Sequence, residues 1–281
     1  MKREIEILVP CNSKRALPRL LELEVGAIYV GLRGWSHAPR CVEVSPSDLE
    51  DISLLCHTHS KRLLLSFNTV PSTPEWSMAV SVVLDAVDRG VDGVICSEPS
   101  VVERLVEARP EVEVHVSVGS SVMNLHDALF WKDLGVKRLI VSPHLSIAEV
   151  QELAGTLAEY GVETEVMIQG VRCSSTVLGL CRMSSYFDMN IENEGIRCLI
   201  WSGSSKRSGI CYKPCAQEWV DQDGAGWDLS PHSFEEVHLV SLYLQAGVGA
   251  FKIGGRGLSA ERIAALVEEM TREMEKIGSY V

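Results

Sequence analysis

Short apolar runs alternate with longer amphipathic segments along most of the chain. The apolar runs are rich in Val and Ile and lie at 5–10, 27–31, 62–67, 93–97, 112–118, 138–142, 163–168 and 250–254. Strands buried on both faces have this composition. The segments between them repeat apolar residues at helical spacing, and the longer ones lie at 75–89, 99–108, 124–134, 146–160, 233–246 and 259–277. Several end at glycines that are typical of helix ends, namely Gly90, Gly135, Gly161 and Gly247.

This alternation predicts an α/β fold, a closed (β/α)8 TIM-type barrel. The alternative is an open doubly wound sheet, but eight units favour closure. One connection is much longer than the rest, because about sixty residues follow Gly170 before the next helical pattern. An insertion after the seventh strand would emerge at the carboxyl ends of the strands, where barrel enzymes have their active sites. We therefore expect one barrel domain over 1–281, with 171–230 as an inserted cysteine-rich subdomain.

Composition and charge narrow the function classes. Of the 281 residues, 46% are hydrophobic and 23% are charged, which is typical of a globular chain with a large core. The formal net charge of −12 disfavours general binding to nucleic acid, whose phosphates it would repel. The start MKREIEILVP is interpreted as a first strand rather than a signal peptide, and no run approaches about 20 apolar residues. A cytoplasmic protein without a membrane span is expected.

The cysteines are unevenly distributed. The chain has nine, an odd number without an export signal, which argues against a disulfide framework. Five of them crowd into the long connection: Cys173, Cys181, Cys198, Cys211 and Cys215. Zinc sites usually pair cysteines two to four residues apart, twice, whereas iron–sulfur clusters accept looser spacing. The pattern favours an iron–sulfur cluster over zinc, and small buried hydrophobic residues are the non-functional alternative.

The runs QGVRCSSTVLGLCRMSSYF and SSKRSGICYKPC resemble the signature of the collagenase-like peptidase family U32. The runs AIYVGLRGWSHAP and AFKIGGR are similar to other motifs of that family, which includes iron–sulfur hydroxylation proteins of the UbiU and UbiV type. The resemblance implies a [4Fe-4S] cluster on Cys173, Cys181, Cys211 and Cys215. It further implies oxygen-independent hydroxylation, with prephenate as the oxygen donor.

The chain differs from the family pattern at the predicted barrel mouth. Pro143 and His144 stand where the family has Arg-Glu, and Gly254 stands where it has a glutamate. Both changes remove charged residues from that end of the barrel. Cys198 is additional to the signature and could replace one of the four ligands.

Other polar residues follow the predicted strands, where barrel enzymes place functional groups. Arg256 follows the eighth strand, and its guanidinium would suit a carboxylated donor, which it can bind through two parallel hydrogen bonds. The further candidates for catalytic residues are Asn68, Glu98, Asn124 and His144. For each of these, a loop or capping role is the alternative.

Three functions remain open at this point. The first is cluster-dependent hydroxylation of a small molecule or of a substrate presented by a partner. The second is a peptidase or other hydrolase at the barrel mouth, although neither a G-x-S-x-G nor an H-E-x-x-H motif occurs. The third is a non-catalytic iron–sulfur subunit that works with a sister subunit of the same family.

Overall fold

Eight parallel strands close into a barrel, as predicted from the apolar runs. The computed structural model describes residues 5–37, 43–173, 176–177, 180–181, 183, 187–192, 195–201, 211, 214–254 and 257–276. Within these residues the barrel strands are β1 (Glu6–Pro10), β2 (Ala27–Leu32), β4 (Arg62–Phe67), β5 (Gly93–Cys96), β6 (Glu113–Val116), β7 (Arg138–Ile140), β8 (Glu163–Arg172) and β16 (Ala250–Ile253). Strand β1 pairs in parallel with both β2 and β16, which leaves no open edge between them.

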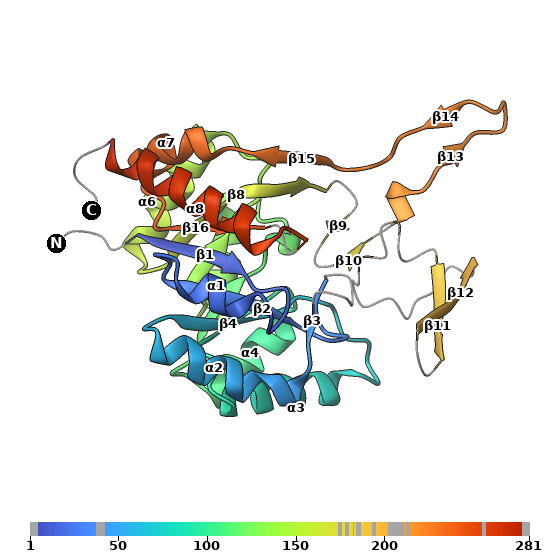
Figure 1. Cartoon of the computed structure of the whole chain (residues 1–281), viewed down its shortest axis with the longest axis horizontal. Coiled ribbons are helices and arrows are strands. Elements are labelled where there is room, and N and C mark those ends of the chain that lie inside the picture. The colour runs from blue at the N-terminus through green and yellow to red at the C-terminus, as the bar shows by residue number, and fades with distance from the viewer. Residues whose placement is uncertain are drawn as a thin grey trace.

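Helices surround the barrel on its outside (Figure 1). They are α1 (Leu17–Leu21), α2 (Leu49–Thr58), α3 (Trp76–Asp88), α4 (Pro99–Ala108), α5 (Leu125–Asp133), α6 (Ile147–Glu159), α7 (Val240–Gln245) and α8 (Ala260–Glu275). The glycines that follow α3, α5, α6 and α7 adopt positive φ angles, as expected of helix-terminating residues. They are Gly90 at 92°, Gly135 at 88°, Gly161 at 70° and Gly247 at 89°. The short parallel strand β3 (Glu43–Val44) extends the sheet beside β2 and was not predicted.

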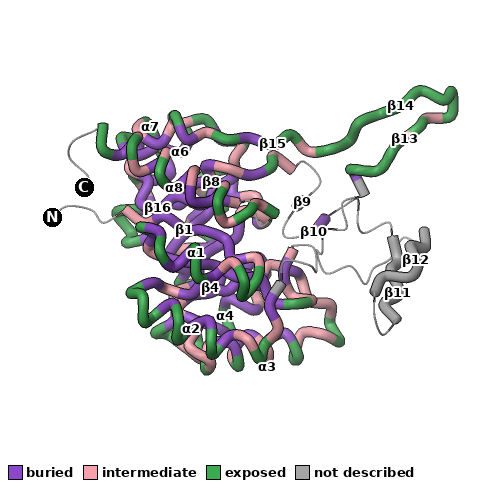
Figure 2. Tube along the Cα trace, in the orientation of Figure 1, coloured by how far each residue is buried: buried purple, intermediate pink, exposed green. Residues whose placement is uncertain are grey.

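The core has two parts because strand side chains alternate between the two faces of the barrel wall. The larger part packs between the strands and the helices, and the strands are the most deeply buried elements (Figure 2). The smaller part fills the barrel interior with Leu8, Ala27, Tyr29, Leu64, Ile95, Ile140 and Ala250. The interior is therefore packed with side chains and is not a pore.

The predicted helix over 233–246 is wrong at its beginning. Residues His232–Glu235 form strand β15, which pairs antiparallel with the end of β8, and only Val240–Gln245 is α-helix. Strand β8 continues to Arg172, four residues beyond its predicted end, and Phe234 lies opposite Gly170. The pairing with β8 provides hydrogen-bond partners for backbone groups that would otherwise bond to one another within a helix. The buried Phe234 ring also stacks on the Arg172 guanidinium, with 4.4 Å between the guanidinium carbon and the ring centroid.

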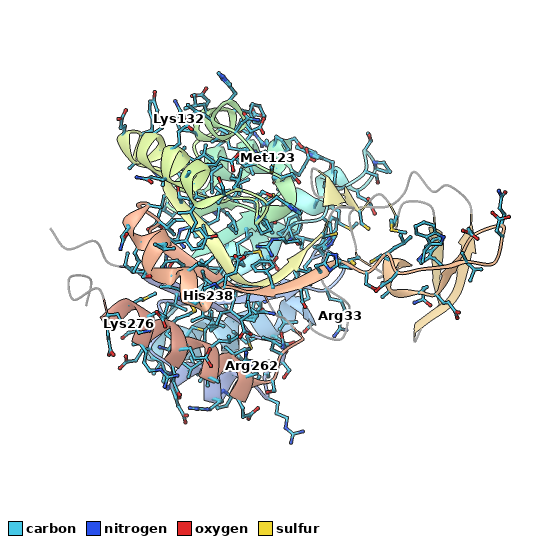
Figure 3. All side chains as sticks on the ribbon, turned by 90° about the horizontal axis from the view of Figure 1, so that it is seen from above. Arg33, Met123, Lys132, His238, Arg262 and Lys276 are labelled. Carbon is cyan, nitrogen blue, oxygen red and sulfur yellow. The ribbon has the colours of Figure 1, made fainter. Side chains whose placement is uncertain are left out.

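The long connection between β8 and β15 contains only short elements. They are β9 (Thr176–Val177), β10 (Leu180–Cys181), β11 (Phe187–Glu192), β12 (Gly195–Trp201), the 3-10 turn η5 (Pro214–Ala216), β13 (Trp219–Val220) and β14 (Gly226–Trp227). They lie beyond the carboxyl ends of the barrel strands (Figure 1). In Figure 3, Arg33, which follows β2, lies on the side toward this connection, whereas Lys276 lies at the opposite end. Among the helices described, none is long and apolar enough to cross a membrane.

Candidate functional site at the barrel mouth

A cavity of about 190 Å³ lies at the carboxyl ends of the barrel strands. The loops after β2, β4, β6 and β7 and the end of β8 provide its walls. The described lining residues are His37, Asn68, Val118, Gly119, Ser121, Ser142, Pro143, His144, Met167, Val171 and Cys173. None of them is Asp, Glu, Lys or Arg, and the lining combines apolar surface with a smaller polar part. Two predicted catalytic candidates, Asn68 and His144, thus share one cavity with a predicted cluster ligand, Cys173.

Met167 occupies the space beside Gly254 at one side of the cavity. A Cβ atom added to Gly254 would clash with the Met167 methyl group and lie 2.7 Å from the Gln169 carbonyl oxygen. A Cβ atom on Gly170 would lie 2.5 Å from the same methyl group. The loss of the family's glutamate at this position therefore goes together with an apolar side chain in its place. The sequence did not single out Met167, because a methionine at the end of an apolar strand looks like ordinary core.

Buried serines surround the upper part of the barrel interior. Ser66, Ser97, Ser117 and Ser142 lie at or just after the carboxyl ends of four consecutive strands, and all are buried. Ser142 also accepts a hydrogen bond from the backbone of His144 at 3.3 Å, which fixes that loop. In the sequence, these residues are recognisable as a serine at or near the end of each of four apolar runs.

Three buried hydroxyl oxygens at this end have no hydrogen-bond partner among the described residues: Thr69 Oγ1, Ser97 Oγ and Ser120 Oγ. Each follows the carboxyl end of a barrel strand. Leaving a buried polar atom without a partner costs about 1–3 kcal/mol, unless water or a ligand supplies the missing bond. This end of the barrel therefore has bonding capacity that its own side chains do not use.

The cysteines of the long connection converge on the same end of the barrel. Cys173 lines the cavity, Cys181 and Cys215 are buried, and the backbone N–H of Cys211 donates to the His37 carbonyl oxygen at 3.2 Å. Burial raises the pKa of the Cys215 thiol, and the charges of Cys173 and Cys181 raise it further. The Cys173 and Cys181 sulfurs are thus each within electrostatic reach of the Cys215 thiol.

Four thiols from separate loops are a donor set that suits an iron–sulfur cluster better than a hard cation. Within the described part of the chain, no three His, Cys, Asp or Glu side chains form a ready-made site for a single metal ion. Cys198 lies in β12, where its backbone is opposite Asn190, and that hairpin lies farther from the barrel than β10 (Figure 1). Arg256 lies outside the described residues.

Glu98 and Asn124, which were candidates for catalysis, cap helices. The Glu98 carboxylate accepts hydrogen bonds from the Ser100 backbone at 3.3 Å and from its hydroxyl at 3.0 Å, at the start of α4. The Asn124 carbonyl oxygen accepts from the Asp127 backbone at 3.0 Å, at the start of α5. Neither side chain lines the cavity. Strand ends and helix starts adjoin in this fold, so their sequence signals overlap.

The fold and the site together define a TIM-type barrel with a cysteine-containing connection at its mouth. The chain belongs to peptidase family U32, whose model matches residues 13–278.

Two curated relatives show what is found in this family. The tRNA hydroxylation protein P of Escherichia coli (strain K12) is 24% identical over 247 residues, 87% of this chain and 51% of that protein. The 23S rRNA 5-hydroxycytidine C2501 synthase of the same strain is 22% identical over 263 residues, 90% of this chain and 36% of that protein. The chain thus spans about half the length, or less, of these relatives. The solved structure of the U32 peptidase Mk0906 shares the fold, with a TM-score of 0.52 and 20% identity over 63% of this chain and 74% of that one.

Proposed function

We propose that this chain is a [4Fe-4S]-dependent hydroxylase that acts without molecular oxygen and takes the oxygen atom from a carboxylated donor such as prephenate. One arrangement carries this proposal: Cys173 lines the cavity at the barrel mouth, and the backbone of Cys211 is bonded to His37, another lining residue. The relatives named as hydroxylation proteins support the reaction class. The proposed ligands are Cys173, Cys181, Cys211 and Cys215. When bound, the cluster would supply electron transfer or an open iron position.

The chain's own residues would bind and orient the substrate. The described cavity offers neutral hydroxyl groups from Ser121 and Ser142 beside the apolar Met167. Such a surface favours a neutral, partly apolar group, because an anion would leave its solvation without a described counter-charge. Arg256, three positions after β16 in the sequence, is the proposed partner of the donor's carboxylate. The formal charge of −12 favours a small molecule, or a group presented by a sister subunit, over a long nucleic acid.

Single Cys→Ser variants, purified and reconstituted without oxygen, test the proposed ligands. Replacing Cys173, Cys181, Cys211 or Cys215 should abolish or strongly reduce bound iron, acid-labile sulfide and visible absorption. Cys56, buried in α2, is the matched control, and Cys56→Ser should leave the iron content of the folded protein unchanged. Full iron loading in all four variants would refute the cluster. If Cys198→Ser abolishes loading while one of the four variants retains it, Cys198 is the fourth ligand.

A hydrolase is the second candidate because Cys173, His37 and His144 line the same cavity. A cysteine activated by a neighbouring histidine is a nucleophile in several classes of hydrolase. The two proposals use Cys173 differently, since a thiolate bound to iron is not available for attack. Peptide cleavage by the iron-free protein, lost in Cys173→Ser and unaffected in Cys181→Ser, would favour the hydrolase. Prephenate binding by the anaerobic holoprotein in calorimetry would favour the hydroxylase.

A further inference from the structure

One side chain joins the barrel wall to the loop that contacts a proposed cluster ligand. Asn68 directly follows β4 and is half-buried at the cavity. Its Oδ1 atom accepts a hydrogen bond from the His37 backbone N–H at 2.9 Å, and its Nδ2 atom donates to the Ser117 hydroxyl at 3.2 Å. The amide therefore uses an acceptor and a donor at once, toward two different loops.

The connection continues on both sides of Asn68. On one side, the His37 carbonyl oxygen accepts from the Cys211 backbone N–H at 3.2 Å. On the other side, the Ser117 backbone donates to the Cys96 carbonyl at 2.8 Å, and its hydroxyl accepts from the Gly119 backbone at 3.3 Å. A continuous series of hydrogen bonds thus runs from the barrel strands through Asn68 and His37 to Cys211. His37 belongs to the loop that follows β2, called the β2 loop below.

We propose that Asn68 is a positioning residue that holds the β2 loop, and through it Cys211, over the barrel mouth. The inference rests on the proposed function, since it gives Asn68 a task toward the cluster and not toward the reacting atoms. Outer hydrogen bonds that fix ligands commonly tune the stability and potential of metal centres. The Trp35 ring, stacked on Phe67 with centroids 5.2 Å apart, holds the same loop independently, so the loss of Asn68 should act locally.

The test uses two substitutions with opposite expectations. Asn68→Ala removes both hydrogen bonds. Asn68→Asp keeps the acceptor for His37, and the Ser117 hydroxyl can rotate to donate to the new carboxylate. The control is Asn124→Ala, which removes an asparagine cap whose side chain bonds to Asp127 at the start of α5.

The first measurement is amide hydrogen exchange at His37 and Cys211 in the iron-free protein. In Asn68→Ala, both amide hydrogens should exchange about five- to tenfold faster than in the wild type, which is the effect of losing one ordinary hydrogen bond. Asn68→Asp should stay within about threefold of the wild type, and Asn124→Ala should change exchange only in α5. The second measurement is iron release to a chelator from the anaerobic holoprotein, which Asn68→Ala should accelerate and Asn68→Asp should largely restore.

Unchanged exchange at Cys211 in Asn68→Ala would overturn the inference, and so would faster exchange with wild-type iron release. A wild-type protein that binds no iron would instead overturn the proposed function. In that case the exchange measurement alone decides whether Asn68 anchors Cys211. The two failures are therefore distinguishable.

Discussion

The two ends of the barrel differ in the charge and bonding of their polar side chains. At the amino ends, charged side chains point inward and bond to one another. Arg138, 4% exposed, lies 2.7 Å from Glu6 and 3.2 Å from Glu165, and also pairs with Glu163. Arg62 continues the network from Glu6 to Glu113. Buried charges are tolerated only when they are paired in this way.

At the carboxyl ends the described lining contains no Asp, Glu, Lys or Arg, and three buried hydroxyls near that end have no partner among the described residues. The charged side chains of the amino end are thus paired with one another, whereas the lining of the carboxyl end has no such ion pairs among the described residues and offers neutral groups. In TIM barrels the amino end serves stability and the carboxyl end serves function. Substitutions at the two ends should therefore separate stability from ligand binding.

The largest effect is expected from Arg138→Leu at the amino end. The change leaves Glu6, Glu163 and Glu165 without their shared cation, and removing one member of a buried charge network typically costs about 3–5 kcal/mol. Urea denaturation measures the free energy of unfolding. The surface pair of Arg109 with Asp88 provides the control, and Arg109→Leu should cost no more than about 1 kcal/mol. Equal losses in the two variants would remove the contrast between a buried network and a surface pair.

At the carboxyl end, Gly254→Ala should destabilise by about 1–3 kcal/mol, because the new Cβ atom meets Met167 and the Gln169 carbonyl. Gly257→Ala is the control, since nothing lies within 4 Å of a Cβ atom there. Adding Met167→Ala to Gly254→Ala should recover only part of the loss, because the backbone carbonyl stays in place. Thermal unfolding of the four proteins checks this, and full recovery would mean that the methionine alone excludes a side chain.

The amino-acid pattern predicted the barrel better than it predicted the site. The eight strands were predicted because Val- and Ile-rich runs leave few other structures, whereas β15 was mistaken for helix. Its pairing with β8 is a long-range contact, which no local pattern around Phe234 reveals. Glu98 and Asn124 cap helices, which is the alternative that the sequence left open, because a strand end and a helix cap occupy adjacent positions. The role of Met167 cannot be predicted from its own strand, because it depends on the close approach of Gly254, which is distant in the sequence.

The smallest expected effect is a pH dependence that arises from His115 and Glu113 at the amino end. His115 is fully buried in β6, with its Nε2 atom 3.1 Å from the Glu113 carboxylate. Burial lowers the pKa of His115 below 6.5, more than its bond to Glu113 raises it. The hydrogen bond from His115, and then Arg62, lower the pKa of Glu113 to about 2.

Both shifts predict that acid weakens the fold. Below pH 6.5 the unfolded chain takes up a proton that the buried His115 resists, so stability should decrease by less than about 1.4 kcal/mol over the next pH unit. Glu113 adds a second decrease as the pH falls from about 4.5 toward 2, reduced by solvent because this side chain is 40% exposed.

Urea midpoints between pH 7.5 and 4.5 measure the first decrease. His115→Gln keeps a donor for Glu113 but does not titrate, so its midpoint should vary less over pH 6.5–5.5. If the wild type and this variant show the same slope there, another group carries the proton uptake and the amino end is not the acid-sensitive part of the barrel.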